Sequence, residues 1–373
     1  MAEMRIAGEG FNVLVEGPDR APAIMLSNSL GADLHMWDAQ IGVLTKYFKV
    51  IRYDSRGHGK SPISGGAYSI AGLGRDAISI MDALQLDRVH WLGLSMGGMV
   101  GQWLLTNARE RIGRAILANT AASMGPPEIW NTRIRTVLSQ GMGAIIPAVI
   151  DRWFTLDFQA RAPAEIARVV AMLRGTPAHG YAGCCGAIRD MDQRESIRSI
   201  GNPVLVIVGQ HDPATTPEAG GYLASAIRDA RLVTLGAAHL SNIEAQADFN
   251  KAIASFLTDA SGRFAPPPRQ SARKAAAKPV AKTPIAKTKA KAPAMKAKAK
   301  AGKSAAPKSS ARKAVGRKAV GHVAPLRKSV GKTAKAPARK PAKKAAKPAA
   351  RKPAAKAAVK KGAPAKNAAH SRR

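Results

Sequence analysis

Apolar residues along the first 260 positions alternate between two patterns. Short runs rich in Val, Ile and Leu, each followed by a glycine-rich or polar turn, indicate buried strands. Longer stretches with apolar residues at helical spacing separate these runs. The pattern is typical of a mostly parallel sheet with helices on both faces, so we expect an α/β protein. The predicted strands are 23–27, 49–53, 89–92, 114–118, 204–208 and 231–235.

The alternation is interrupted at about 120–200. Apolar residues there recur at helical spacing from Ile134 to Leu173, with no convincing strand between them. We interpret this interval as a helical cap inserted over the sheet. A last helix is predicted at about 247–257, so the α/β body occupies residues 1–260.

Residues 261–373 have a different composition. Between Arg263 and Arg373 there are 35 Lys and Arg and no Asp or Glu, which leaves 24 basic residues against 24 acidic ones in the body. The net charge of +35 therefore belongs to this tail. Its common residues are Ala, Lys, Pro, Arg, Gly and Ser, which cannot form an apolar core, so we expect a disordered polybasic tail.

Cysteine usage and the N-terminus bear on the compartment. Cys184 and Cys185 are adjacent, and vicinal cysteines rarely form a structural disulfide. The chain does not begin with a basic region followed by an apolar run, and it has no apolar stretch of 18 residues. We expect a cytoplasmic protein without membrane contact. Metal-binding spacing of His and Cys is absent, so we expect no metal.

Ser95 is the strongest candidate for chemistry. It is central to Gly93-Leu94-Ser95-Met96-Gly97-Gly98, which follows the strand 89–92 and precedes an apolar helical stretch. Small residues beside the serine permit the strained turn of a nucleophile elbow. A glycine-rich helix start is the alternative, but the strand, turn and helix context favours a nucleophile.

A serine nucleophile needs a base and an acid, which should follow it along the chain. Asp212 lies in the turn after the strand 204–208, and His239 lies in the turn after the strand 231–235. A capping aspartate and an incidental loop histidine are the alternatives. His211 competes with His239, but it precedes the last strand. We therefore predict the triad Ser95, Asp212 and His239.

Acyl transfer also needs hydrogen-bond donors for the developing oxyanion. The backbone amide of Met96, directly after the nucleophile, is one candidate. The second should come from the loop after the strand 23–27, where we choose Leu30, with Ser29 as the alternative.

The segment 53–59 follows the next strand and could suggest a phosphate or metal site through Asp54 and His58. We assign it a structural role instead, as a turn under the nucleophile loop in which Asp54 pairs with Arg56.

With the order Ser95, Asp212, His239 in place, the body resembles the α/β-hydrolase superfamily and, within it, the 3-oxoadipate enol-lactonases. The resembling segments are Leu-Ser-Asn-Ser-Leu-Gly at 26–31, Tyr-Asp-Ser-Arg-Gly-His-Gly at 53–59, Gly-Leu-Ser-Met-Gly-Gly at 93–98, Asn-Thr-Ala at 119–121 and Ala-Ala-His-Leu-Ser-Asn at 237–242.

The resemblance implies hydrolysis of the enol-lactone 4,5-dihydro-5-oxofuran-2-acetate to 3-oxoadipate in aromatic catabolism, without cofactor or metal. The substrate carboxylate could be recognised in the cap by Trp130 with Arg133, or by Arg152 with Trp153. Packing tryptophans and solvated arginines are the alternatives.

Some family members carry a fused decarboxylase domain where this chain has its tail, so a bifunctional fusion is excluded.

The tail resembles the tails of linker histones and bacterial histone-like proteins. A polycation of this kind binds phosphate backbones with little base preference, so residues 263–373 suggest nonspecific nucleic-acid or polyanion binding. A low-complexity extension without a partner is the alternative.

Two other functions stay open for the whole chain: another carboxylesterase or C–C bond hydrolase of the same fold, and a nucleoid-associated protein that acts through its tail.

Overall fold

The computed structural model describes residues 2–6 and 9–257. Its eight strands form one mixed sheet in the order β1-β2-β4-β3-β5-β6-β7-β8. The first two strands run antiparallel to their neighbours, and β4, β3, β5, β6, β7 and β8 pair in parallel. The strands are β1 (Ala2–Ile6), β2 (Glu9–Glu16), β3 (Ala23–Ser27), β4 (Lys49–Tyr53), β5 (Val89–Leu94), β6 (Ile112–Ala118), β7 (Val204–Gly209) and β8 (Arg231–Leu235).

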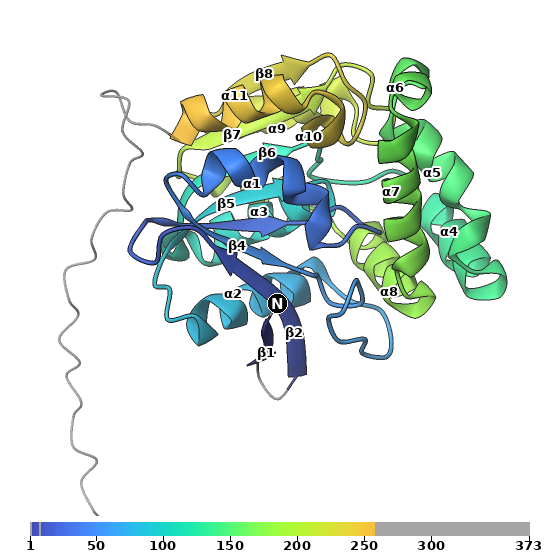
Figure 1. Cartoon of the computed structure of the whole chain (residues 1–373), viewed down its shortest axis with the longest axis horizontal. Coiled ribbons are helices and arrows are strands. Elements are labelled where there is room, and N and C mark those ends of the chain that lie inside the picture. Colours follow the sequence, from blue (N-terminus) through green and yellow to red (C-terminus); the bar gives the residue numbers. More distant parts are fainter. Residues whose placement is uncertain (1, 7–8, 258–373) are drawn as a thin grey trace, which may run out of the picture. The chain divides into compact units, whose positions relative to one another are not determined.

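Helices cover both faces of the sheet. In Figure 1, α1 and α11 lie together over one face, while α2, α3 and α9 lie over the other. The helices of the body are α1 (Asp38–Leu44), α2 (Ile70–Ala83), α3 (Met96–Asn107), α9 (Pro217–Ala226), α10 (Ser241–Glu244) and α11 (Gln246–Leu257). Short 3-10 turns are η1 (Leu34–Trp37), η2 (Arg109–Arg111), η3 (Met142–Ala144) and η4 (Ser196–Ser199).

Between β6 and β7 the chain forms a series of helices, which gather beside the sheet at the right of Figure 1, and one isolated β-bridge that pairs Ser123 with Asp192. We call these helices the cap. They are α4 (Pro127–Gln140), α5 (Ile146–Trp153), α6 (Leu156–Arg161), α7 (Pro163–Gly175) and α8 (Ala178–Arg189). The structure thus confirms the predicted α/β class, with a mostly parallel sheet and a helical insertion.

The predicted strands agree with the observed ones to within two residues at each end. The prediction missed β1 and β2, the antiparallel pair at one edge of the sheet. In β2 the polar Asn12 separates buried Phe11 from buried Val13, and burial falls off toward the exposed Val15, so the strand lacks the continuous apolar run by which the others were found.

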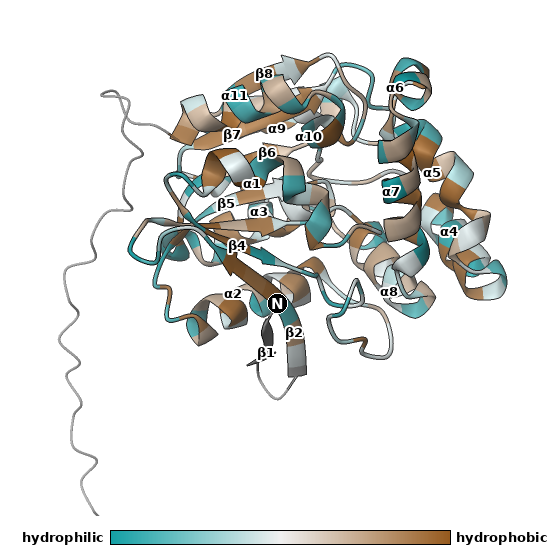
Figure 2. Ribbon diagram, viewed as in Figure 1, coloured by the Kyte–Doolittle hydropathy of each residue, from teal (hydrophilic) through white to brown (hydrophobic). Residues whose placement is uncertain are grey.

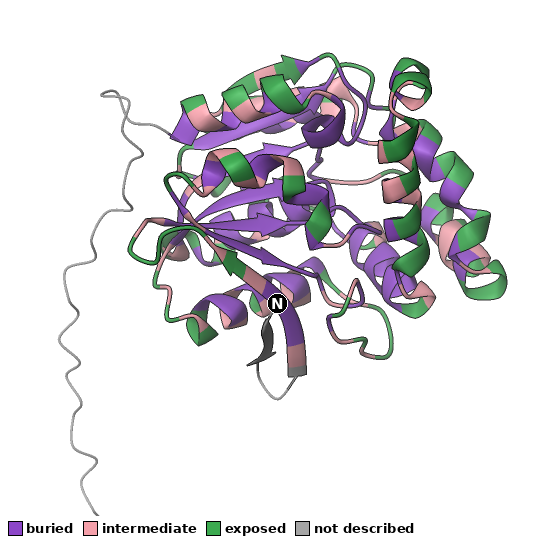
Figure 3. Cartoon of the chain, viewed as in Figure 1, coloured by how far each residue is buried: buried purple, intermediate pink, exposed green. Residues whose placement is uncertain are grey.

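The core lies between the sheet and its helices. Every residue of β5 and β7 is buried, and both strands are dominated by apolar side chains, as Figures 2 and 3 show. Parallel strands covered on both faces need apolar side chains on both faces, which explains these unbroken runs. No helix among the described residues is long and apolar enough to cross a membrane. The predicted polybasic tail lies outside the described residues.

Candidate active site

Ser95 stands in a strained turn between β5 and α3. Its backbone has φ 56° and ψ −115°, in the left-handed region that residues with a side chain rarely adopt. A Cβ at Gly97 would lie 2.1 Å from the Ser27 carbonyl oxygen, and one at Gly93 would lie 2.1 Å from the Gly97 carbonyl oxygen. The glycines flanking Ser95 therefore allow the close backbone approach that this turn requires.

His239 and Asp212 come together from the ends of neighbouring strands. Asp212 follows β7, His239 follows β8, and the distance from His239 Nδ1 to Asp212 Oδ2 is 2.8 Å. Both side chains are buried. Because Nδ1 faces Asp212, Nε2 is the imidazole nitrogen left for a substrate or for Ser95. The competing His211 is exposed.

The Asp212 carboxylate is held by several donors besides His239. Oδ1 accepts the amides of Ala214, at 2.8 Å, and Thr215, at 3.0 Å. Oδ2 accepts the Thr215 hydroxyl at 2.7 Å and the Asn119 Nδ2 at 3.0 Å. Although burial acts to raise its pKa, the charge on His239 and these hydrogen bonds lower the pKa of Asp212 to about 2. Asp212 is therefore ionised at neutral pH and oriented toward the imidazole.

The predicted oxyanion donors differ in their hydrogen bonding. The Ser29 amide donates to the Met36 sulfur at 3.3 Å, and the Gly97 amide donates to the Asn28 carbonyl at 3.0 Å. Within the described part of the chain, the amides of Leu30 and Met96 have no protein acceptor. Of the two candidates in this loop, Leu30 is the one whose amide has no acceptor among the described residues.

A cavity of about 330 Å³ lies against this arrangement. Ser95, His239 and Leu30 line it from the body, and Trp130 and Trp153 line it from the cap. Its lining contains no Asp or Glu among the described residues. A pocket of this size, mostly apolar and with a few convergent polar groups, suits a small organic substrate.

Two guanidinium groups of the cap also line the cavity. Arg133 lies over the Trp130 ring, with 4.8 Å from its Cζ to the ring centroid. Burial, together with the neighbouring charge of Arg133, lowers the pKa of Arg152. The structure therefore brings together all four cap residues that the sequence suggested for carboxylate recognition, Trp130, Arg133, Arg152 and Trp153, and places two positive charges at a cavity whose described lining holds no carboxylate.

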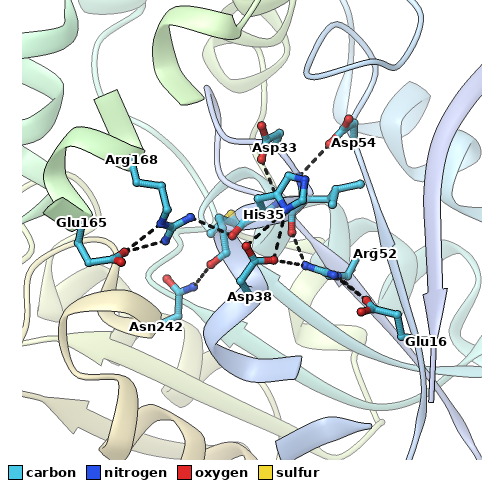
Figure 4. A network of polar contacts seen from close by, with 11 residues as sticks. Glu16, Asp33, His35, Asp38, Arg52, Asp54, Glu165, Arg168 and Asn242 are labelled. Atoms are coloured by element: carbon cyan, nitrogen blue, oxygen red, sulfur yellow. Dashed lines mark hydrogen bonds and ion pairs between the residues drawn. The ribbon is translucent and has the colours of Figure 1, made fainter. Parts of the chain in front are cut away.

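The expected pairing of Asp54 with Arg56 is wrong. Asp54 instead accepts hydrogen bonds from the Leu34 amide at 2.8 Å, part of the network in Figure 4, and from Asn12 Nδ2 at 2.7 Å. Arg56 pairs with Asp76 of α2, with nitrogen–oxygen distances of 2.7 and 2.8 Å. The turn points the two side chains toward different partners, which their spacing in the sequence does not reveal.

The same turn contacts the loop of Leu30. His58 is fully buried, and its Nε2 accepts the Gly31 amide at 2.8 Å. Burial lowers the pKa of His58 to about 4, so its imidazole is neutral at pH 7 and able to accept this bond. The segment 53–59 thus holds the predicted oxyanion loop in place through the hydrogen bond between His58 and Gly31.

Several polar residues around the site were missed by the sequence reasoning. Asn119 has φ 42° and joins Asp212 to the His239 loop, since its Nδ2 also donates to the Ala238 carbonyl at 3.2 Å. The Thr120 hydroxyl donates to the Ser95 carbonyl at 2.8 Å. Their only sequence signal is their position directly after the strand that neighbours the nucleophile strand, where polar residues of a parallel sheet meet.

Comparison with known proteins agrees with this geometry. The family model described as alpha/beta hydrolase fold matches residues 22–246. The 3-oxoadipate enol-lactonase 2 of Acinetobacter baylyi is 39% identical over 247 residues, covering 66% of this chain and 92% of the relative. The 3-oxoadipate enol-lactonase 1 of the same organism is 35% identical over 250 residues, covering 67% and 94%.

Among solved structures, the enol-lactonase from Burkholderia xenovorans superposes with a TM-score of 0.67 at 43% identity, covering 68% of this chain and 98% of that one. The match spans nearly the whole length of each of these relatives. The chain therefore belongs to the α/β-hydrolase family, in the branch that contains the 3-oxoadipate enol-lactonases.

Proposed function

We propose that the chain is a serine hydrolase that opens the enol-lactone 4,5-dihydro-5-oxofuran-2-acetate with water to give 3-oxoadipate. The observation that carries the proposal is one cavity lined by Ser95 and His239 of the body and by Arg133 and Arg152 of the cap. A lactone that bears a carboxylate fits such a cavity, because its ester carbonyl can meet Ser95 and His239 while its carboxylate meets the two arginines. The printed names of the related enol-lactonases support the same substrate.

The proposed reaction begins with Ser95. His239 Nε2 takes the proton from Ser95 Oγ as the oxygen attacks the lactone carbonyl, and the amides of Leu30 and Met96 stabilise the oxyanion. Asp212 orients His239 and stabilises its protonated form. The ring C–O bond then breaks, and the leaving enol, still tethered to the acyl chain, takes up a proton and becomes a ketone. Water activated by His239 releases 3-oxoadipate and regenerates Ser95.

The direct test is an assay of the purified protein on the enol-lactone, with loss of substrate absorbance and formation of 3-oxoadipate as readouts. A panel of p-nitrophenyl esters, saturated lactones and vinylogous diketones would separate this activity from a general carboxylesterase or a C–C bond hydrolase. Preference for a diketone, with no turnover of the lactone, would reject the proposal.

We assign substrate-carboxylate binding to Arg133 and Arg152, with Trp130 and Trp153 as the apolar walls. An anion between the two guanidinium groups would relieve their mutual repulsion and accept charge-assisted hydrogen bonds. Replacing either arginine by Gln should raise KM for the enol-lactone by about tenfold to hundredfold, the effect of losing one or two such bonds. KM for uncharged p-nitrophenyl acetate should change little.

The matched control is Arg135→Gln. Arg135 is on the same helix, α4, but it is exposed and pairs with Glu128 at 2.8 Å. Its replacement should leave both KM values unchanged. Equal losses on the charged and uncharged substrates in Arg133→Gln and Arg152→Gln would argue for a packing role and against carboxylate binding.

We divide the chain into a hydrolase domain, residues 1–260 with its cap at about 120–200, and a polybasic segment, residues 261–373. We also place the protein in the cytoplasm, which is supported by Cys184 and Cys185, two buried free thiols. Burial raises the pKa of Cys185 to about 12, so this thiol is protonated and unreactive at neutral pH.

The charge of residues 263–373 supports a second function, nonspecific binding of nucleic acid or another polyanion. Affinity of the full chain for duplex DNA should fall roughly 10³-fold or more between about 50 and 200 mM salt, with little dependence on sequence. A variant that lacks residues 263–373 should lose this binding and keep its esterase activity. DNA binding that persists in the truncated variant would contradict the assignment.

A further inference from the structure

One buried carboxylate, that of Glu244, contacts both the His239 loop and the cap. Glu244 is the last residue of α10, five positions after His239, and its side chain is largely buried. Its Oε2 accepts the Ala238 amide at 2.8 Å. Its Oε1 accepts the hydroxyl of Thr155 in the cap and, at 3.3 Å, the Thr155 amide. The residue before His239 and the residue before helix α6 are thus held by the same carboxylate.

A second contact runs parallel to the first. The Leu240 amide, directly after His239, donates to the Trp153 carbonyl at 3.1 Å. The Trp153 side chain lines the substrate cavity, and its ring centroid is 6.4 Å from that of His239. The residues on both sides of His239 are therefore connected to the cap, Leu240 directly to Trp153 and Ala238 through the Glu244 carboxylate to Thr155. A shift of the cap at Trp153 would move the imidazole with it.

The remaining surroundings indicate that this carboxylate serves as a hydrogen-bond acceptor and not as half of an ion pair. Within the described residues, Glu244 forms no salt bridge, and the nearby Arg161 donates to its carbonyl at 3.5 Å. Other polar contacts between the cap and the body lie away from the His239 loop. Arg168 of α7 donates to the His35 carbonyl at 3.1 Å (Figure 4), and the Thr176 hydroxyl donates to the Gly31 carbonyl at 2.9 Å. The His239 loop itself is connected to the cap by the Leu240 amide and by Glu244, and of these two contacts only that of Glu244 is made through a side chain.

We propose that Glu244, through Thr155, is a positioning residue that couples the placement of the cap to that of His239. The inference rests on the proposed ester hydrolysis by Ser95 and His239. In this arrangement a substrate that orders Trp153 also fixes the loop that carries the base. A displacement of about 1 Å at a catalytic group costs up to about a hundredfold in rate, so loosening this connection should be visible in kcat.

The test compares four single variants and one double variant of the full chain. Glu244→Gln keeps the side-chain size but turns an NH₂ group toward one set of donors. Thr155→Val keeps the shape and removes the hydroxyl, whereas Thr155→Ser retains it. Ser69→Ala is the matched control, because Ser69 caps α2 through its hydroxyl at 3.0 Å from the Gly72 amide, on an exposed helix end. Active sites are counted by titrating Ser95 with a fluorophosphonate, and kcat and KM are measured on the enol-lactone and on p-nitrophenyl acetate.

We expect Glu244→Gln and Thr155→Val to lower kcat per titrated site by about tenfold to hundredfold on both substrates and to raise KM for the lactone. Thr155→Ser and Ser69→Ala should match the unmodified chain. The double variant of Glu244→Gln with Thr155→Val should lose less than the product of the two single effects, because both remove the same contact.

A merely structural role predicts something else: fewer titratable sites with kcat per site unchanged. That outcome in Thr155→Val would overturn the inference, and the comparison with Thr155→Ser decides the matter even where Glu244→Gln does not fold. Because p-nitrophenyl acetate needs only Ser95 and His239, a chain that hydrolyses this ester but not the lactone would reject the proposed substrate and leave this test in force.

Discussion

Ser95→Ala should lower kcat on the enol-lactone and on p-nitrophenyl esters by about 10⁵-fold to 10⁶-fold, the loss expected when the nucleophile of a serine hydrolase is removed. His239→Ala should cost about as much, and the double variant should be no worse than either single one, because the two residues act as a unit. The measurement is steady-state turnover with fluorophosphonate labelling as a second readout, which should fail in Ser95→Ala.

Ser225→Ala is a suitable control, since this serine is exposed on α9, away from the cavity lining. It should label and turn over like the unmodified chain. Ser95→Ala that kept more than about one hundredth of the activity would mean that another residue or a contaminant carries the reaction.

Asp212→Asn should lower kcat by about 10⁴-fold while the protein stays folded. Asparagine can keep one oxygen on the amides of Ala214 and Thr215, so the turn is preserved. Its NH₂ group, however, would face the Nδ1 of His239, which would then have to accept a hydrogen bond. That tautomer leaves Nε2 protonated and unable to take the proton of Ser95.

The measurement pairs kcat with a thermal unfolding curve. Asp19→Asn, a change at an almost fully exposed carboxylate, is the control and should alter neither. If Asp212→Asn retained more than about one tenth of the activity, the acid would have to be sought elsewhere.

The parts of the fold that could be predicted are those fixed by local chemistry. A parallel strand buried on both faces must be apolar throughout, and each such strand was found in the sequence. The antiparallel strands β1 and β2 were missed because their sequences contain no continuous apolar run: Asn12 interrupts β2, and Glu3 and Arg5 are spaced along β1. The helical cap was found because its amphipathic spacing persists over several helices.

In the candidate site, too, some residues could be predicted from the local sequence and others could not. Ser95, Asp212 and His239 could be found because each follows a recognisable strand in a fixed order along the chain. Asn119 and Glu244 could not, because their partners lie 93 and 89 positions away and depend on which strands and helices are neighbours in space. The error at Asp54 and Arg56 has the opposite cause, since nearness in the sequence suggested a pair that the turn separates.

The adjacent strands β5 and β6 are each followed directly by a residue with left-handed backbone, Ser95 with φ 56° and Asn119 with φ 42°. The Ser95 amide donates to the Ala118 carbonyl at 2.9 Å, so the two ends are joined. For protein design this means that the pentapeptide around the serine is not a portable unit. A scaffold meant to receive this nucleophile would have to supply a second strand whose last residue turns in the same unusual sense, or the transplanted hydroxyl would relax away from its base.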